Sequence, residues 1–285
     1  MTRASTEPYA RQVFTEARLT GDLVLEYADL GDPDGTPVVY QPGSPSTAGG
    51  GALLDEAARR HGVRLVSVSR PGYGASTPTP PGLASVGRHV VELVDLLGLS
   101  TFGTLGSSGG GPFALATAAV APERVTRVVV AAGSGMPDEG DDVAEASTVI
   151  AEVREFADRL QGLDADAFRA AMSANTPPNE TYFDGRPEGA TFFADLARAL
   201  DPPDGFARDN LSWGVPWDFD VTSVATPVDL FYGEVDQMVP SHRGELLAGL
   251  LPNATLTVLP GAGHGVTTFG VMDRLLALLA DHPAG

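Results

Sequence analysis

The stretch Gly106 to Gly110, "GSSGG", fits the pattern G-x-S-x-G, with Ser108 at its centre and Ser107 at the variable position. A serine hydroxyl is a poor nucleophile at neutral pH. It reacts when an imidazole accepts its proton and a carboxylate orients that imidazole. A Gly-rich pentapeptide alone is weak evidence, but here an apolar run precedes it and a small-residue helix pattern follows it. The pattern therefore predicts a nucleophile at Ser108 and requires a histidine and an acid elsewhere in the chain.

His264 is the histidine best placed to act as the base. It lies in the Gly-rich loop "LPGAGHGV", directly after the run "ATLTVL", which predicts a strand. A side chain in such a loop can project over the end of a sheet without a bulky neighbour. The other four histidines fit structural roles at a helix end, on a helix, at a helix start and in the tail: His61, His89, His242 and His282.

Asp236 is the predicted acid. In "YGEVDQMVP" it follows the strand "VDLFY" and precedes a helix predicted near Pro240. Glu234 is a rival carboxylate in the same loop, but Asp236 lies farther beyond the strand, where the chain turns. The order Ser108, Asp236, His264, with each residue after a strand, predicts that the three side chains converge at the carboxyl edge of one sheet.

The elements that must position these residues alternate between strand and helix. Two β-type stretches, 13–19 and 23–30, flank a short "TGD" turn and predict an antiparallel pair. Helices are predicted in the segments between later strands, including 83–97 with its apolar stripe and a closing helix at 269–279. Short valine-rich and leucine-rich runs predict strands buried on both faces of a parallel sheet, and they begin at Thr36, Arg64, Phe102, Arg127, Thr226 and Ala254.

Residues 133–226 interrupt this alternation. Helices are predicted for "AEASTVIAEVREFADRL", "DADAFRAAMSA" and "EGATFFADLARAL", joined by loops at "NTPPNETYFDGRPEG" and "DPPDGFARDNLSWG". We therefore expect an α/β core of residues 1–132 and 227–285 and a helical insertion at 133–226. Apolar residues of the insertion that suit the lining of a pocket are Met172, Phe192, Phe193, Phe206, Trp213 and Trp217.

The composition restricts the partners. The formal net charge of −19 repels polyanions, so neither nucleic acid nor an anionic membrane is expected as a partner. We expect a small-molecule substrate. The N-terminal stretch "MTRASTEPYARQVF" lacks the apolar run of a secretory signal, which predicts a cytoplasmic protein. The chain has no cysteine, which excludes disulfides, thiol nucleophiles and thiolate metal sites. No cofactor or metal is expected, and no oligomeric state is indicated.

Together these motifs resemble the α/β-hydrolase fold superfamily, in its serine hydrolase branch with a helical cap. The matching stretches run from about Val24 to the C-terminus and are "YADLGDPDGTPVVYQPGSPST", "SRPGYGAST", "LGSSGGGPFALA", "PVDLFYGEVDQMVP" and "LPGAGHGV". The resemblance implies an eight-stranded, mostly parallel sheet flanked by helices, with the insertion as a cap over the active site. It also implies an oxyanion hole made by the backbone N–H groups of Ser44 and Gly109.

The chain departs from the family pattern at two positions. Pro42 stands where the family usually has a histidine, and Ser69 stands where an aspartate is common. The family's histidine mainly supports loop geometry, so we expect the difference to concern the loop that follows the third strand. The serine at position 108 counts against haloalkane dehalogenases and epoxide hydrolases, which resemble this chain but have an aspartate there.

The expected activity is hydrolysis of a small ester or related acyl substrate through a Ser-His-Asp triad and an acyl-enzyme, as in carboxylic ester hydrolases. An aminopeptidase of the proline iminopeptidase type is an alternative, and it needs carboxylates such as Glu152 or Glu155 aimed at a substrate amine. A binding or sensor protein with negligible turnover is a second alternative. A cofactor-free lyase or perhydrolase is a third. Ester, lactone, peptide-like and carbon–carbon bond substrates all stay open.

Overall fold

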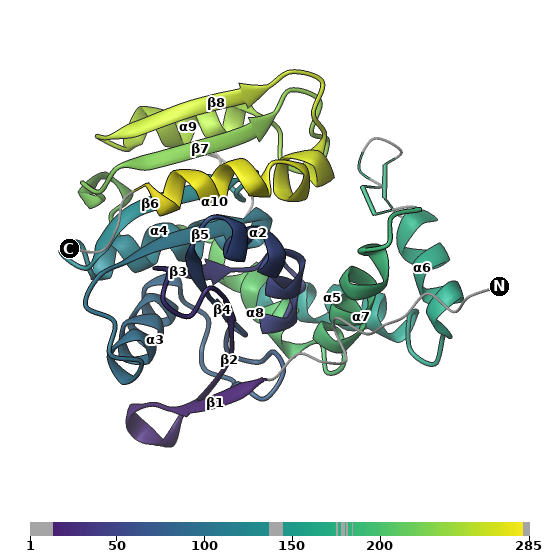
Figure 1. Cartoon of the computed structure of the whole chain (residues 1–285). Coiled ribbons are helices and arrows are strands. Elements are labelled where there is room, and N and C mark those ends of the chain that lie inside the picture. Colours follow the sequence, from purple (N-terminus) through teal and green to yellow (C-terminus); the bar gives the residue numbers. More distant parts are fainter. Residues whose placement is uncertain are drawn as a thin grey trace.

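The core is an eight-stranded sheet with the strand order β1-β2-β4-β3-β5-β6-β7-β8 (Figure 1). β2 runs antiparallel to β1 and β4, and the remaining neighbours are parallel, which confirms the expected mostly parallel sheet. The computed structural model describes residues 14–136, 145–174, 176, 177, 180, 182, 183 and 185–281. The strands are β1 (Thr15–Arg18), β2 (Val24–Gly31), β3 (Thr36–Gln41), β4 (Val63–Val68), β5 (Phe102–Ser107), β6 (Val125–Ala131), β7 (Val228–Gly233) and β8 (Ala254–Leu259).

Helices cover both faces of the sheet. Consecutive side chains of β6 are buried on opposite faces of the sheet. Val128 and Val130 belong to one apolar cluster, and Val129 belongs to the other. This explains why the central strands are apolar without alternation. None of the helices in the described residues is long and apolar enough to cross a bilayer. The first cluster includes residues of α3 (Leu83–Leu96), α4 (Gly111–Val120) and α9 (His242–Leu250), and the second includes residues of α2 (Asp55–Arg60) and α10 (Met272–Ala280).

The long connection between β6 and β7 is helical in its described part. It contains α5 (Ala146–Asp158), α6 (Ala165–Ala174), α7 (Gly189–Ala199) and α8 (Asp204–Trp213). The three helices predicted there from the sequence are confirmed as α5, α6 and α7. The four helices gather to one side of the sheet (Figure 1). Side chains from α6 and α7, including Phe168 and Leu196, form a separate small apolar cluster.

The loop predicted for "DPPDGFARDNLSWG" is wrong, because most of this stretch forms α8. Pro203 is the N-cap residue, and a proline is tolerated there because the first N–H groups of a helix have no partner within the helix. Arg208 and Asp209 are almost fully buried. These buried polar residues give the helix no apolar stripe, so its periodicity is hidden in the sequence.

Candidate active site

Ser108 lies in a sharp turn between β5 and α4. Its φ is +48°, in the left-handed region that residues other than glycine rarely adopt. The turn requires small neighbours, since a Cβ added to Gly110 would lie 2.0 Å from the carbonyl oxygen of Gln41. The Ser108 carbonyl accepts a hydrogen bond from the backbone N–H of Ser134 at 3.1 Å. The strained backbone of Ser108 is thus held by the ends of neighbouring strands.

The two adjacent serines have different surroundings. Ser107 is the last residue of β5 and is 1% exposed, and its hydroxyl is 2.8 Å from the hydroxyl of Tyr40. Burial raises the pKa of Tyr40 to about 12, although the hydrogen bond with Ser107 opposes this shift. The Tyr40 phenol therefore stays neutral near neutral pH. Both serines line the cavity, but only the Ser108 hydroxyl lies within hydrogen-bond distance of His264.

Asp236, His264 and Ser108 form a hydrogen-bonded chain at the carboxyl edge of the sheet. Oδ2 of Asp236 is 2.8 Å from Nδ1 of His264, and Nε2 of His264 is 3.0 Å from Oγ of Ser108. The Asp236 side chain is fully buried, and its Oδ1 accepts the N–H groups of Met238 and Val239 at 2.8 and 2.7 Å. Because the backbone fixes this carboxylate, it can hold the imidazole with Nε2 facing the serine.

The rival acid and the other histidines lie apart from the hydrogen-bonded set of Asp236, His264 and Ser108. Glu234 is exposed, and its Oε2 accepts the N–H of Gly261 at 2.8 Å. His61, at the end of α2, lies 3.2 Å from Asp273. His89 and His242 belong to α3 and α9 and do not line the cavity, whereas His282 lies outside the described residues.

Glu180 is a site residue that sequence reasoning missed. It is 6% exposed and lies in the segment between α6 and α7. Its Oε1 accepts the backbone N–H of Gln237 at 2.9 Å, and its Oε2 accepts the backbone N–H of His264. One carboxylate thereby joins the loop that carries Asp236 to the loop that carries His264. Its partners are main-chain groups, so no side-chain pattern in the sequence points to it.

The two residues expected to donate to an oxyanion lie beside each other. Ser44 belongs to the loop 42–47 after β3, which we call the β3 loop, and its peptide bond to Pro45 is cis. A Cβ added to Gly109 would lie 2.6 Å from Oγ of Ser44, and a Cβ added to Gly43 would lie 3.5 Å from Cβ of Ser108. Within the described part of the chain, no acceptor is found for the backbone N–H of Ser44. These main-chain groups therefore surround the Ser108 turn.

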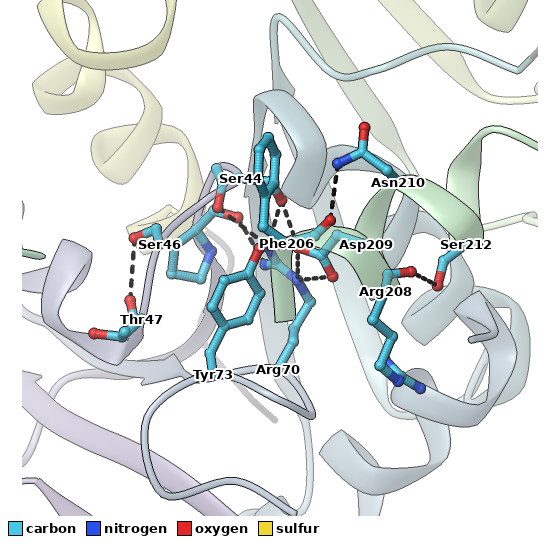
Figure 2. A network of polar contacts seen from close by, with 12 residues as sticks. Ser44, Ser46, Thr47, Arg70, Tyr73, Phe206, Arg208, Asp209, Asn210 and Ser212 are labelled. Atoms are coloured by element: carbon cyan, nitrogen blue, oxygen red, sulfur yellow. Dashed lines mark hydrogen bonds and ion pairs between the residues drawn. The ribbon is translucent and has the colours of Figure 1, made fainter. Parts of the chain in front are cut away.

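Arg70 supports the β3 loop from below (Figure 2). Its Nη1 donates to the carbonyl oxygen of Pro42 at 2.7 Å, and its Nη2 donates to the carbonyl oxygen of Gly43 at 3.1 Å and to Oγ of Ser44 at 2.8 Å. The guanidinium is fully buried and needs a counter-charge. Although burial opposes the charged form, the charge of Asp209 and its hydrogen bonds raise the pKa of Arg70 above its ordinary value.

Asp209 on α8 supplies that counter-charge. Its side chain is also fully buried, and its Oδ2 lies 2.6 Å from Nη2 of Arg70. The same oxygen accepts the hydroxyl of Ser44 at 2.5 Å and the hydroxyl of Tyr73 at 2.9 Å. Figure 2 shows these side chains converging on the carboxylate. Two segments of the core and one helix of the insertion meet at this ion pair.

Asp195 on α7 binds the other end of the β3 loop. Its Oδ2 accepts the hydroxyl of Ser46 at 2.5 Å and the N–H of Thr47 at 3.2 Å, and its Oδ1 accepts the hydroxyl of Thr47. Asp195 is 3% exposed. Burial raises the pKa of Asp195 to about 6, against the opposing hydrogen bonds from Ser46 and Thr47. The carboxylate has protein donors on both oxygens.

A cavity of about 200 Å³ opens beside Ser108 and His264 and is walled mainly by apolar side chains. Of the candidates from the sequence, Met172, Phe192 and Phe193 line it. The other three do not: Phe206 packs on Phe156, Trp213 lies edge-on to Phe113, and Trp217 stacks on Phe219. Four further aromatic residues, which the sequence reasoning had not singled out, complete the wall, namely Tyr40, Tyr182, Phe183 and Phe269.

The cavity carries no basic side chain other than His264 among its described lining residues. Arg169 and Arg186 stack on the rings of two wall residues, with guanidinium carbons 5.6 and 4.2 Å from the ring centroids, but do not line it. Glu152 and Glu155 are exposed on α5 and also lie outside the lining. The described residues include no group of three or more His, Asp or Glu side chains that could hold a metal ion.

Comparison with known proteins identifies related sequences and folds. A family model described as "alpha/beta hydrolase fold" matches residues 36–267. The chain is 29% identical to a non-heme chloroperoxidase of Streptomyces lividans, covering 84% of this chain and 89% of that one. It is 26% identical to a 2-hydroxymuconate semialdehyde hydrolase of Pseudomonas putida, covering 77% and 75%. The crystal structure of a hydrolase from Pseudomonas aeruginosa aligns with a TM-score of 0.70 at 23% identity, covering 93% and 97%.

Proposed function

Because this chain belongs to the alpha/beta hydrolase fold family, we propose that it is a serine hydrolase with Ser108 as nucleophile, His264 as base and Asp236 as acid. The family and the names of the relatives support hydrolase activity in general. The observation that carries the finer proposal is the chain of contacts from Asp236 to His264 to Ser108, at 2.8 and 3.0 Å. Both distances are within hydrogen-bond range, as a general base requires.

The first half of the reaction forms an acyl-enzyme. Nε2 of His264 takes the proton of Ser108 as Oγ attacks the substrate carbonyl carbon. The backbone N–H groups of Ser44 and Gly109 donate to the developing oxyanion, and each such donor contributes about 3 to 4 kcal/mol. The carbonyl re-forms, the bond to the leaving group breaks, and the imidazolium of His264 gives its proton to that group. The acyl group then remains on Ser108.

The second half releases the acyl group. A water molecule takes the place of the leaving group, and His264 removes its proton as the oxygen attacks the acyl carbon. The same two N–H groups bind the second oxyanion. When the tetrahedral intermediate collapses, the carboxylic acid leaves and the proton returns from His264 to Oγ of Ser108. Asp236 orients the imidazole throughout the reaction.

We infer that the insertion at 133–226 acts as a cap over this site, with the core formed by 1–132 and 227–285. Residues of α6 and α7, including Met172 and Phe193, share one cavity with Ser108 and His264. A substrate in this cavity contacts both parts of the chain. The aromatic wall excludes water from the reacting carbonyl, which strengthens the hydrogen bonds to the oxyanion.

The preferred substrate is a small, uncharged ester or related acyl compound with an apolar group. The wall of the cavity is rich in aromatic side chains, which favour apolar groups. An anionic substrate, such as a muconate, finds no arginine among the described residues that line the cavity. The carboxylates of Glu180 and Asp195 line the cavity, but protein donors already contact both oxygens of each, which disfavours their use by the amine that an aminopeptidase must bind.

Labelling with a fluorophosphonate, followed by peptide mass spectrometry, tests the proposal. We expect one adduct on Ser108, loss of the adduct in Ser108→Ala, and turnover of p-nitrophenyl esters but not of proline arylamides. Absence of label and of turnover in the wild-type protein contradicts the proposal and favours the binding or sensor alternative. Analysis of the products with and without hydrogen peroxide separates hydrolysis from perhydrolysis, and a carbon–carbon bond substrate in the screen reports lyase-like activity.

A further inference from the structure

We propose that Asp195 and Asp209 are positioning residues that hold the β3 loop in the conformation of an oxyanion hole. The inference rests on the proposed function, because the loop matters for catalysis only if Ser108 is the nucleophile. Both carboxylates come from the insertion, Asp195 from α7 and Asp209 from α8. Two helices outside the α/β core therefore contribute directly to the geometry of the reaction centre.

The β3 loop depends on these side chains for nearly all of its length. Arg70, the partner of Asp209, binds the main-chain oxygens of Pro42 and Gly43. Arg70 and Asp209 together bind the Ser44 hydroxyl, and Asp195 binds the next polar residues, at positions 46 and 47. The proline at position 42 has no N–H and no imidazole with which to support the loop itself. The Arg70–Asp209 pair at one end of the β3 loop and Asp195 at the other thus take the place of a support within the loop.

The hydroxyl of Ser44 has a single orientation in this arrangement. It donates to Oδ2 of Asp209 at 2.5 Å and accepts from Nη2 of Arg70 at 2.8 Å. This contact fixes the side chain, and with it the peptide whose N–H is expected to face the oxyanion. A shift of about 1 Å in a donor of this kind is costly, since preorganised groups act only at the correct position.

The test of Asp209 and Asp195 requires substitutions that keep the size and shape of each side chain. Replacing Asp209 by alanine would leave the buried Arg70 guanidinium without a counter-charge, without an acceptor from this side chain and next to a cavity, which destabilises a protein strongly. Asparagine also removes the counter-charge and the charge-assisted hydrogen bonds, but it keeps the shape and one acceptor oxygen for the guanidinium. We therefore choose Asp209→Asn and Asp195→Asn as the test variants.

The chain offers a matched control on each helix. Arg208, next to Asp209 on α8, binds Oγ1 of Thr79 at 2.7 Å and nearby carbonyl oxygens of the core. Arg198, on α7 with Asp195, pairs with Glu26 at 2.6 Å. These contacts tie the same helices to parts of the core outside the β3 loop. Arg208→Gln and Arg198→Gln therefore report the cost of loosening each helix alone.

Steady-state kinetics with a neutral p-nitrophenyl ester and binding of a boronic acid inhibitor provide the readouts. We expect kcat to fall roughly 10- to 100-fold in each Asp→Asn variant, with KM changed less than about threefold, because oxyanion contacts form only in the transition state. Affinity for the boronate, whose tetrahedral adduct carries an oxygen in the same place, should fall by a similar factor. The arginine controls should keep kcat within about threefold of wild type.

Folded Asp→Asn variants with wild-type kcat and boronate affinity overturn the inference. An equal loss in all four variants also overturns it, because it assigns the effect to helix packing. If Asp209→Asn does not fold, Ser44→Ala replaces it: this variant keeps the backbone N–H and the Arg70–Asp209 pair, and should show the same fall in kcat. A wild-type protein that is not labelled at Ser108 is a separate result, which removes the proposed function and this inference with it.

Discussion

The carboxylate of Glu180 accepts the backbone N–H of His264, although the two residues lie 84 positions apart in the sequence. The other oxygen of the same carboxylate accepts the N–H of Gln237, the neighbour of Asp236. The two loops that carry the proposed base and acid are therefore linked through a residue that belongs to neither. Their separation sets the distance over which Asp236 can orient the imidazole.

Glu180→Ala should lower both activity and stability. The buried N–H of His264 and the part-buried N–H of Gln237 lose their acceptor, and an unsatisfied buried donor costs about 1 to 3 kcal/mol. We expect kcat/KM for a neutral ester to fall roughly tenfold and the unfolding midpoint to drop by several degrees. Glu152→Ala, at an exposed position on α5, is the control and should leave both unchanged. A normal kcat/KM in Glu180→Ala would show that the link has no role in catalysis.

Ser108→Ala and Ser107→Ala should separate chemistry from packing. Ser108→Ala should reduce ester turnover by roughly 10³-fold or more and abolish fluorophosphonate labelling, since the nucleophile is absent. Ser107→Ala should keep the label while losing about 1 kcal/mol of stability, because the buried Tyr40 hydroxyl loses its partner. Kinetics, intact-protein mass spectrometry and urea unfolding give the measurements. Labelling that persists in Ser108→Ala and vanishes in Ser107→Ala would reverse the assignment.

Asp195 should give the stability a specific pH dependence. Burial raises its pKa in the folded protein to about 6 from an ordinary value of 3.8, so the folded state binds the proton more tightly than the unfolded state. The stabilisation is complete below about pH 3.8 and is lost as the pH rises through about 6. Relative to Asp195→Asn, wild type should lose roughly 2 to 3 kcal/mol of unfolding free energy between pH 4 and pH 7. Urea unfolding of both proteins across this range is the test, and parallel profiles contradict the prediction.

The cavity should discriminate against negative charge. We expect p-nitrophenyl hexanoate to be hydrolysed with kcat/KM at least about tenfold higher than the p-nitrophenyl half-ester of glutarate, a carboxylate of similar length. An ionised group transferred to an apolar wall without a partner is strongly disfavoured. Measurement at several salt concentrations controls for repulsion by the acidic surface, which weakens as salt screens it. Equal rates for the two esters at high salt would show that the wall does not select by charge.

The sequence was sufficient to predict where the chemistry-bearing residues of the core would lie. Ser108, Asp236 and His264 each follow a buried strand, and parallel strands bring their carboxyl ends to one edge, so the order of motifs predicts proximity. The structure brings these three side chains within hydrogen-bond distance. The parallel part of the sheet was predictable because its strands are short apolar runs, whereas the number of eight strands followed from the family resemblance.

The supports of the site were not predictable. Glu180, Asp195 and Asp209 lie in the insertion, and their partners are backbone N–H groups, hydroxyls and one buried arginine that are distant in the chain. Helix α8 was missed because the residues that fix it, Arg208 and Asp209, are polar and look like solvent-facing residues of a loop. Tertiary pairing decides these positions, and a single sequence carries no periodic trace of it.

The placement of Asp195 and Asp209 limits how this enzyme can be recombined with its relatives. Exchanging residues 133–226 for the equivalent segment of another hydrolase would remove both carboxylates while Arg70, Ser44 and Thr47 stayed behind in the core. Such a chimera inherits an unpaired buried guanidinium and an unsupported β3 loop, whatever the quality of its new pocket. The segment that shapes the pocket therefore cannot be exchanged without affecting the β3 loop. A successful graft must carry an aspartate at each of the two helix positions.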